Sequence, residues 1–175
     1  KHTLKYLKGT INHGLTFNKV NKLQLIGYSD SDWGGSEDRR SISGYCFYLG
    51  ENTALVSWKS RKQNTVALST CEAEFIAATC SCQESKFLFQ LLTDMTGYSQ
   101  QPVTLHIDNQ GAIELTRNPI FRQRTKHIDI RYYYIRSQID QNLINLKYVQ
   151  SQDNTADLFT KPISKIKLNK FKLCQ

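Results

Sequence analysis

The chain has 175 residues, of which 39% are hydrophobic and 22% charged, which suits one packed domain with extensions and argues against global disorder. The formal net charge of +8 favours a polyanionic partner, most often nucleic acid, over a merely solvated basic surface. No apolar run reaches the roughly 18 residues of a membrane-spanning helix. The five cysteines lack paired CxxC spacing, so we expect reduced thiols and no zinc site.

In the first third of the chain, a short helical segment precedes three predicted strands. Residues 1–20 hold a short helical phrase, with Leu4 and Leu7 one turn apart, followed by a turn. Residues 23–30 alternate apolar and polar side chains, and residues 42–50 and 54–60 follow as two more strands after tight connections. Three consecutive strands of this kind predict an antiparallel meander. Trp58, in the third strand, is expected in the core.

Residues 69–95 have the periodicity of one long helix, because Ala73, Ile76 and Ala77 recur at helical spacing. Ser69 and Glu72 form a capping box, so the helix is expected to start at residue 70 and to end at Gly97.

Strands and helices alternate in the rest of the chain. Residues 102–108 and 143–149 read as strands, residues 109–118 and 127–141 as helices, and residues 153–163 as the start of a last helix capped by Asp153 or Asn154. This order predicts an α/β fold with a five-stranded mixed sheet, antiparallel on one side and parallel on the other, flanked by helices.

Four acids lie where apolar patterns begin or end. Asp30 ends the first strand, Glu74 lies in the first turns of the long helix, Asp108 ends the fourth strand, and Asp157 lies in the last helix. Strand ends and helix tips meet at one edge of such a sheet, where four carboxylates would repel one another unless cations neutralised them. Oxygen ligands suit Mg²⁺ or Mn²⁺, and two such ions can hold the attacking and leaving oxygens of a phosphodiester. The sequence therefore predicts a metal-dependent nuclease.

Other acids compete for these roles. Asp32 lies on the same side of the first strand as Asp30, so either is a possible ligand. Glu72 is assigned to the helix cap, which leaves Glu74 as the ligand. The two later acids have structural alternatives, as a helix cap and as an exposed helix acid.

Six motifs occur in order: YSDSDWGG, DRRSISGYCFYLG, VSWKSRKQNTVALSTCEAEFIA, HIDNQGAI, RTKHIDIRYYYIR and NTADLFTK. In these motifs the chain resembles, over nearly its whole length, the ribonuclease H domain of copia-type LTR retrotransposon polyproteins. The resemblance implies a ribonuclease H fold and hydrolysis of the RNA strand of RNA–DNA hybrids during reverse transcription, with two Mg²⁺ (or Mn²⁺) ions. By motif, the family's ligands fall on Asp30, Glu74, Asp108 and Asp157.

The resemblance also divides the chain and implies its context. Residues 1–20 look like the end of the preceding reverse transcriptase region, residues 21–163 like the ribonuclease H domain, and residues 164–175 like a basic tail. The reverse transcriptase domain of the same polyprotein is the implied protein partner, and the cytoplasm, within virus-like particles, the implied location. Many cellular ribonucleases H carry a His-bearing loop before the last Asp, which is missing here. His127 is the candidate for that role, or else a structural His at a helix start.

Contacts to the phosphates and 2′-hydroxyls of a hybrid are expected from basic and polar side chains, although a solvated basic face is the alternative for each. The predicted set is Arg39, Arg40, Ser41, Ser43, Lys59, Arg61, Lys62, Asn109, Gln110, Arg122, Arg124 and Lys126.

Three other functions stay open. The chain is alternatively a non-catalytic, domesticated or decayed derivative, a DNA-preferring integrase-like or resolvase-like nuclease on the same fold, or a structural connection domain. The presence of all four carboxylates argues against decay, and a connection domain would not need them.

Overall fold

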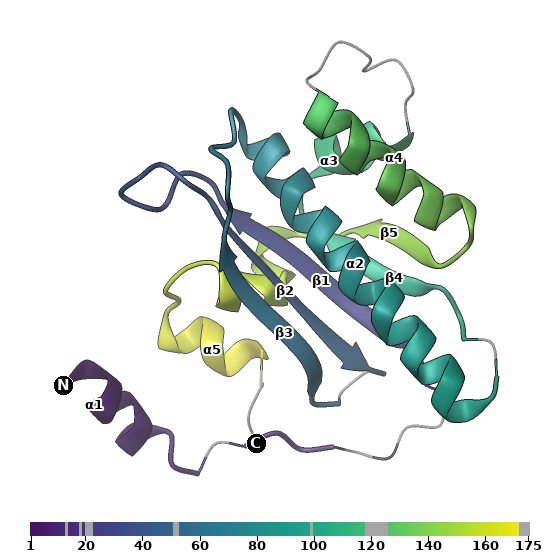
Figure 1. Ribbon diagram of the computed structural model, residues 1–175. Helices are drawn as coiled ribbons and strands as arrows, with labels where there is room; N and C mark the ends of the chain where they lie inside the picture. The colour runs from purple at the N-terminus through teal and green to yellow at the C-terminus, as the bar shows by residue number, and fades with distance from the viewer. Residues whose placement is uncertain are drawn as a thin grey trace.

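The computed structural model describes residues 1–12, 14–17, 19, 23–50, 53–98, 100–117 and 126–171 (Figure 1). At its centre is a five-stranded sheet in the order β3-β2-β1-β4-β5. The pairs β1–β2 and β2–β3 are antiparallel, whereas β4 runs parallel to β1 and β5 parallel to β4. The predicted mixed sheet is confirmed. Its strands are β1 (Leu25–Asp32), β2 (Ile42–Leu49), β3 (Leu55–Lys62), β4 (Val103–Ile107) and β5 (Ile144–Tyr148).

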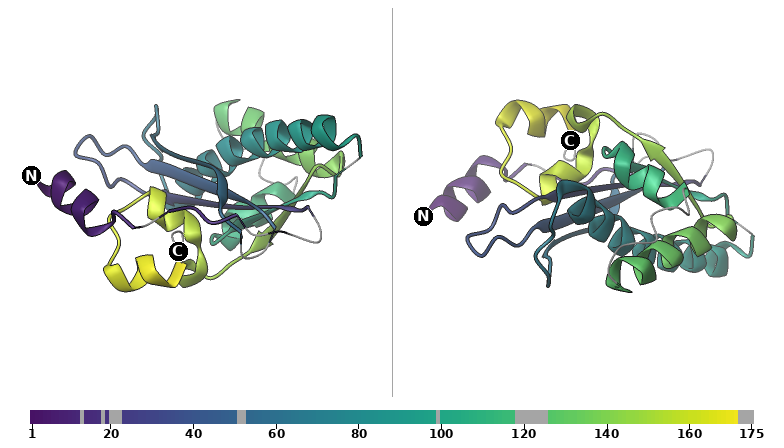
Figure 2. Two further views of the ribbon diagram at one scale, coloured as in Figure 1. Left: turned by 90° about the horizontal axis from the view of Figure 1, so that it is seen from below. Right: turned by 90° about the horizontal axis from the view of Figure 1, so that it is seen from above.

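Helices cover both faces of this sheet. The α-helices are α1 (His2–Gly9), α2 (Thr70–Thr96), α3 (Gln110–Arg117), α4 (Lys126–Asp140) and α5 (Lys165–Phe171), and the 3₁₀-helices are η1 (Ser151–Asp153) and η2 (Thr155–Phe159). Helices α2 and α4 lie over one face, and the segment with η2 and α5 lies over the other (Figure 2). Among the described residues, none of the helices combines the length and hydropathy that a membrane crossing would require.

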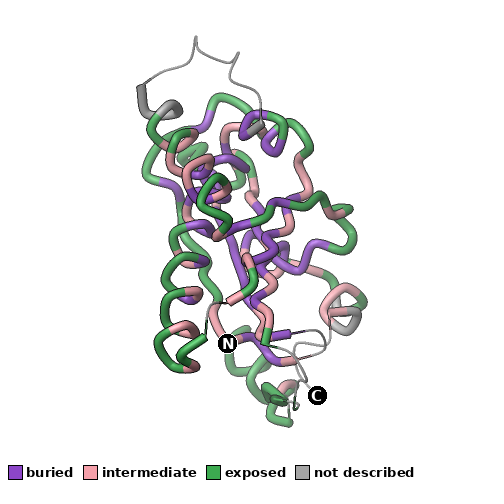
Figure 3. Tube along the Cα trace, turned by 90° about the vertical axis from the view of Figure 1, so that its right-hand side faces the viewer, coloured by how far each residue is buried: buried purple, intermediate pink, exposed green. Residues whose placement is uncertain are grey.

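The hydrophobic core lies between the sheet and helices α2 and α4. Phe47 of β2, Leu105 of β4 and Ile135 of α4 are fully buried there. Buried positions accordingly gather in the middle of the tube drawn in Figure 3. Helix α1, by contrast, has no buried residue. The proposed boundaries after residues 20 and 163 stay a prediction.

The ends of α2 follow the sequence signals. The Ser69 Oγ accepts a hydrogen bond from the Glu72 N–H at 3.1 Å, and the Glu72 carboxylate accepts one from the Leu68 N–H at 2.8 Å. Gly97 closes the helix in the left-handed conformation, at φ 71°. The predicted start and end of this helix are confirmed, and the cap fixes the turn from which Glu74 projects.

Two expectations were wrong. Residues 153–163 do not start an α-helix, because the segment is a short 3₁₀-helix held to the sheet. Asn154 caps it by accepting from the Ala156 N–H, and its Nδ2 donates to the Ser29 carbonyl of β1 at 2.9 Å. Trp58 is 52% exposed and not a core residue. It lies on the edge strand β3 and points away from α2, since its neighbour Ser57 hydrogen-bonds Glu84 of α2.

Removing the α2 cap should destabilise the fold. We expect Ser69→Ala to lower the free energy of unfolding by about 1 kcal/mol, because the Glu72 N–H in the first turn of the helix loses its acceptor. Ser69→Asp, which keeps an acceptor at the N-terminus of the helix, should stay within about 0.5 kcal/mol of the parent. Urea denaturation followed by circular dichroism measures both, and equal stability of the Ala variant and the parent would contradict the cap assignment.

Candidate active site

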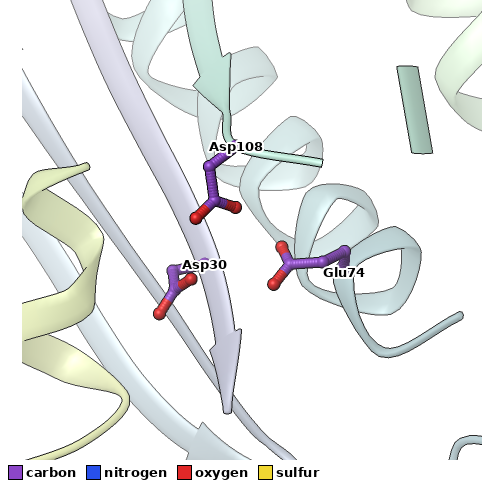
Figure 4. Close-up of side chains that lie close together, drawn as sticks. All are labelled: Asp30, Glu74 and Asp108. Atoms are coloured by element: carbon purple, nitrogen blue, oxygen red, sulfur yellow. The ribbon is translucent and has the colours of Figure 1, made fainter. Parts of the chain in front are cut away.

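Three carboxylates converge at one end of the sheet (Figure 4). Asp30 comes from β1, Glu74 from α2, and Asp108 directly follows β4. Each offers an oxygen, and these three oxygens lie within 4.8 Å of one another. The strand register accounts for the meeting, because Ser29 pairs with Ile107 and each of these two residues is followed in the chain by an aspartate. Two of the acids are buried, with exposed fractions of 2% for Asp30 and 6% for Glu74.

Glu74 is held by the strand beside it. The N–H and the Oγ of Ser31 both donate to its Oε1, each at 2.9 Å. Its Oε2 is buried and, within the described part of the chain, has no hydrogen-bond partner. Burial first, and then the charges of Asp30 and Asp108, raise the pKa of Glu74 to about 8, against the opposing effect of the Ser31 hydrogen bonds.

Asp30 is held from the opposite face. The Thr160 hydroxyl, just after η2, donates to its Oδ2. Burial is the largest influence on the pKa of Asp30 and raises it, while the Thr160 hydrogen bond acts in the other direction. The two buried acids of the cluster therefore have separate supports, Ser31 within β1 and Thr160 beyond η2.

The three acids fit a divalent cation. A cation would offset the repulsion between the carboxylates, which burial strengthens, and it would give the Glu74 Oε2 a partner. All three donors are carboxylate oxygens, which suits Mg²⁺ or Mn²⁺ better than softer metals. The geometry thus supports one cation site directly.

Asp157 is buried but does not join this group. Its carboxylate forms an ion pair with Lys161 at 2.8 Å and a second one with Lys167 of α5. Its side chain is 2% exposed, so the two lysines balance a charge that is almost removed from water. Neither lysine was singled out from the sequence. Lys161 ends the motif NTADLFTK, whose sequence does not show that this side chain turns toward Asp157, and nothing in the basic tail indicates that Lys167 folds back.

The competing acids are used elsewhere. The Asp32 carboxylate lies against Gly35, where an added Cβ would come within 2.0 Å of its Oδ2. Glu72 caps α2, as described above. The structure therefore separates Asp32 and Glu72 from the cluster that contains Asp30 and Glu74.

Basic residues line a cavity of about 260 Å³ on the side of the sheet that carries α2. Lys59, Arg61 and Lys62 of β3, together with Arg131 of α4, contribute its positive charge. Part of its wall is Glu84, which accepts hydrogen bonds from Ser57 at 2.7 Å and from Tyr45 at 3.1 Å. Three predicted contact residues on β3, Lys59, Arg61 and Lys62, thus meet in one place, and the cavity adds an arginine that the sequence did not single out.

The other predicted contact residues have varied surroundings. Ser41 is fully buried and accepts a hydrogen bond from the Gly34 N–H at 3.2 Å, so its hydroxyl closes the loop after β1. Ser43 is buried, accepts from Gln63 and borders the cavity. Arg40 and Lys62 form exposed ion pairs with Asp38, whereas Arg39 and Gln110 are exposed and Asn109 caps α3 through its Oδ1. Arg122 and Arg124 lie outside the described residues, as do the side chains of Lys126 and His127 at the start of α4.

The fold is that of the ribonucleases H. The N-terminal RNase H domain of a Mycobacterium tuberculosis protein matches it with a TM-score of 0.59 at 12% identity, covering 86% of this chain and 99% of that chain. LC11-RNase H1, solved in complex with RNA/DNA hybrid, matches with a TM-score of 0.57 at 11% identity, covering 78% and 94%.

The sequence has relatives among retrotransposons, although no family model matches it. It is 39% identical over 172 residues to the retrovirus-related Pol polyprotein from transposon RE1 of Arabidopsis thaliana, which covers 98% of this chain. The relationship to copia-type Pol polyproteins predicted from the motifs is therefore confirmed. The chain spans 12% of the length of that polyprotein.

The raised acid pKa values predict a pH-dependent stability. Without metal, Glu74 binds a proton in the folded state between its ordinary pKa of 4.5 and about 8, where the unfolded chain does not. The free energy of unfolding should therefore fall as pH rises through this interval, and Asp30 acts in the same direction. Thermal melts in EDTA should show this fall, and Glu74→Gln should flatten it. An equally steep fall in the Gln variant would contradict the assignment, and the exposed Asp94→Asn serves as control.

The lysines at Asp157 predict a competition with divalent cations. We expect Lys167→Gln to bind Mn²⁺ more tightly, by roughly tenfold, because the carboxylate of Asp157 loses one of its two positive partners. Titration calorimetry measures this directly. Lys86→Gln on the exposed side of α2 removes one positive charge far from Asp157 and is the control. If Mn²⁺ affinity rose equally in both variants, the effect would come from net charge alone and the assignment to Asp157 would be wrong.

Proposed function

We propose that this chain is a ribonuclease H that hydrolyses the RNA strand of RNA–DNA hybrids during retrotransposon reverse transcription. The observation that carries the proposal is the convergence of Asp30, Glu74 and Asp108 within 4.8 Å at the end of β1 and β4. Buried carboxylates gathered in this way are costly unless they bind cations. The relationship to a Pol polyprotein supports the connection to reverse transcription.

Two divalent cations, Mg²⁺ or Mn²⁺, are proposed as cofactors, with Asp157 as the fourth ligand. Such ions supply a nucleophilic water and neutralise the charge that develops on the leaving oxygen. The chain's own part is to hold the carboxylates in place. Ser31 orients Glu74, and Asp157 would have to exchange a lysine partner for a cation before it could take part.

The basic cavity beside β3 is proposed to bind a backbone phosphate of the hybrid. Ser60 of β3, Gly44 of β2 and Asp30 of β1 follow one another across the sheet, so the cavity edge lies two strands, about 10 Å, from the acid row. Phosphate contacts fix the register of a duplex without reading its sequence. Lys59 and Arg61 would anchor the duplex there while the acids act on a nearby phosphodiester.

The substrate class and the context rest on the relatives. LC11-RNase H1 was solved with an RNA/DNA hybrid, and we propose the same class of substrate here. Its 2′-hydroxyls distinguish the RNA strand from DNA. The reverse transcriptase domain of the same polyprotein is the proposed partner, and virus-like particles in the cytoplasm the proposed location. A catalytic role for His127 stays a prediction.

The decisive variant is Asp108→Asn. It keeps the shape of the side chain but removes one of three charges, so we expect an intact fold and a loss of hybrid cleavage of at least about 100-fold. The assay uses a labelled RNA–DNA hybrid with Mg²⁺, Mn²⁺ or EDTA, and Asp94→Asn, an exposed acid outside the cluster, is the matched control.

Single-stranded RNA and duplex DNA complete the assay. Metal-dependent cutting of only the hybrid's RNA strand supports the proposal. Normal hydrolysis by folded Asp108→Asn would refute the site. A parent protein that binds hybrid without cutting it would indicate the non-catalytic derivative. Preferential cutting of duplex DNA would indicate an integrase-like nuclease.

A further inference from the structure

Thr160 contacts both the acid cluster and Asp157, which lies apart from it. It follows η2 directly and is 3% exposed. Its hydroxyl donates to Oδ2 of Asp30 and also lies 3.3 Å from the backbone carbonyl oxygen of Asp157. One side chain therefore contacts a carboxylate of the cluster and the backbone of the fourth acid.

The sheet makes room for this contact. Gly44 of β2 pairs with Asp30 of β1, and a Cβ at Gly44 would come within 2.7 Å of the Thr160 methyl group and 2.9 Å of the Phe159 Cβ. Because Gly44 has no side chain, the end of η2 can approach the backbone of β2 closely. At the other end of η2, Asn154 donates to the Ser29 carbonyl. The helix is thus tied to two consecutive residues of β1, one of which is Asp30.

The hydroxyl donates a side-chain hydrogen bond that helps to fix the plane of the Asp30 carboxylate, in addition to a backbone contact with Ser31 and the charge of Lys161. The terminal torsion of an aspartate has broad minima, and repulsion from Glu74 and Asp108 would turn the Asp30 oxygens away from the cluster. A donor on Oδ2 opposes that rotation and leaves the other oxygen to face its neighbours. Glu74 has its own support from Ser31, so Thr160 serves Asp30 alone.

We propose that Thr160 is a positioning residue, which holds the Asp30 carboxylate in the orientation that binds the divalent cation and keeps η2, with Asp157, beside it. The inference rests on the proposed function in that the cation serves hybrid cleavage. The cation binding itself can be measured without substrate.

Two substitutions separate the hydroxyl from the shape of the side chain. Thr160→Val keeps the volume that fills the space over Gly44 but has no donor, whereas Thr160→Ser keeps the donor and loses the methyl group. Calorimetric titration with Mn²⁺ in the absence of nucleic acid reports cation affinity. Hybrid cleavage is then followed as kcat and KM at saturating Mg²⁺, after urea denaturation has established that each variant is folded.

We expect Thr160→Val to weaken Mn²⁺ binding by about 10- to 100-fold, as the loss of a partner that orients a metal ligand does elsewhere. Its kcat should fall while KM for the hybrid stays within about threefold, because Thr160 is buried and would not reach a bound duplex. Thr160→Ser should retain Mn²⁺ affinity within about threefold of the parent.

Two results would overturn the proposal. One is parental Mn²⁺ affinity in Thr160→Val. The other is an equal loss in the Val and Ser variants, which would make the role one of packing. If the parent binds Mn²⁺ but does not cut the hybrid, the proposed function fails, and the difference between the two variants in Mn²⁺ affinity still decides the role of Thr160.

Discussion

The structure depends on bringing negative charges together at the end of β1 and β4 and keeping them there. Parallel pairing of these two strands puts Asp30 and Asp108 side by side, and α2 crosses the sheet so that Glu74 reaches the same place. Removal from water makes each charge more costly and each repulsion stronger. The neighbouring sequence consequently has to supply a partner for each acid that the fold buries.

Each buried acid has a different partner, and the partners come from both faces of the sheet. Ser31 donates twice to Glu74 on the α2 side, and Thr160 donates to Asp30 from the η2 side. Asp157 has the charges of two lysines instead. Neutral donors orient a carboxylate without supplying a positive charge, so a cation can still take that place, whereas the lysines already occupy it at Asp157. Asp30 and Glu74 can therefore accept a cation directly, whereas Asp157 must first lose a lysine partner.

Regular periodicity made most of the fold predictable. The meander, the long capped helix and the parallel pair each follow from signals within a short window, and strand ends then indicated where acids would meet. Contacts set by tertiary packing were not predictable. The exposure of Trp58 depends on β3 being an edge strand, and the 3₁₀ geometry after Asn154 depends on that side chain reaching Ser29. Sequence spacing carries neither fact.

The side chains that hold the acids in place were only partly predictable from the sequence. Ser31 stands between two aspartates, where it could have been read as part of the site. Thr160 lies three residues after Asp157 in a motif that the sequence did single out, and Gly44 lies opposite Asp30 once the register is known. The missing step was the register itself, because a one-residue shift would turn every side chain of the strand to the other face. Lys167 had no local signal, since the tail holds several lysines.

The charge distribution has a consequence for how substrate and metal bind. The chain carries a formal net charge of +8, and Lys59 and Arg61 line a cavity about two strands from the acids, so a polyanion is attracted to this side of the molecule. At the acids themselves, a phosphodiester would meet like charge and be repelled. Cations between the carboxylates and the phosphate turn that repulsion into attraction, and the phosphate in turn adds a ligand to each cation. Cation binding and hybrid binding in the proposed enzyme are therefore expected to strengthen each other by the same factor, as linkage between two sites requires.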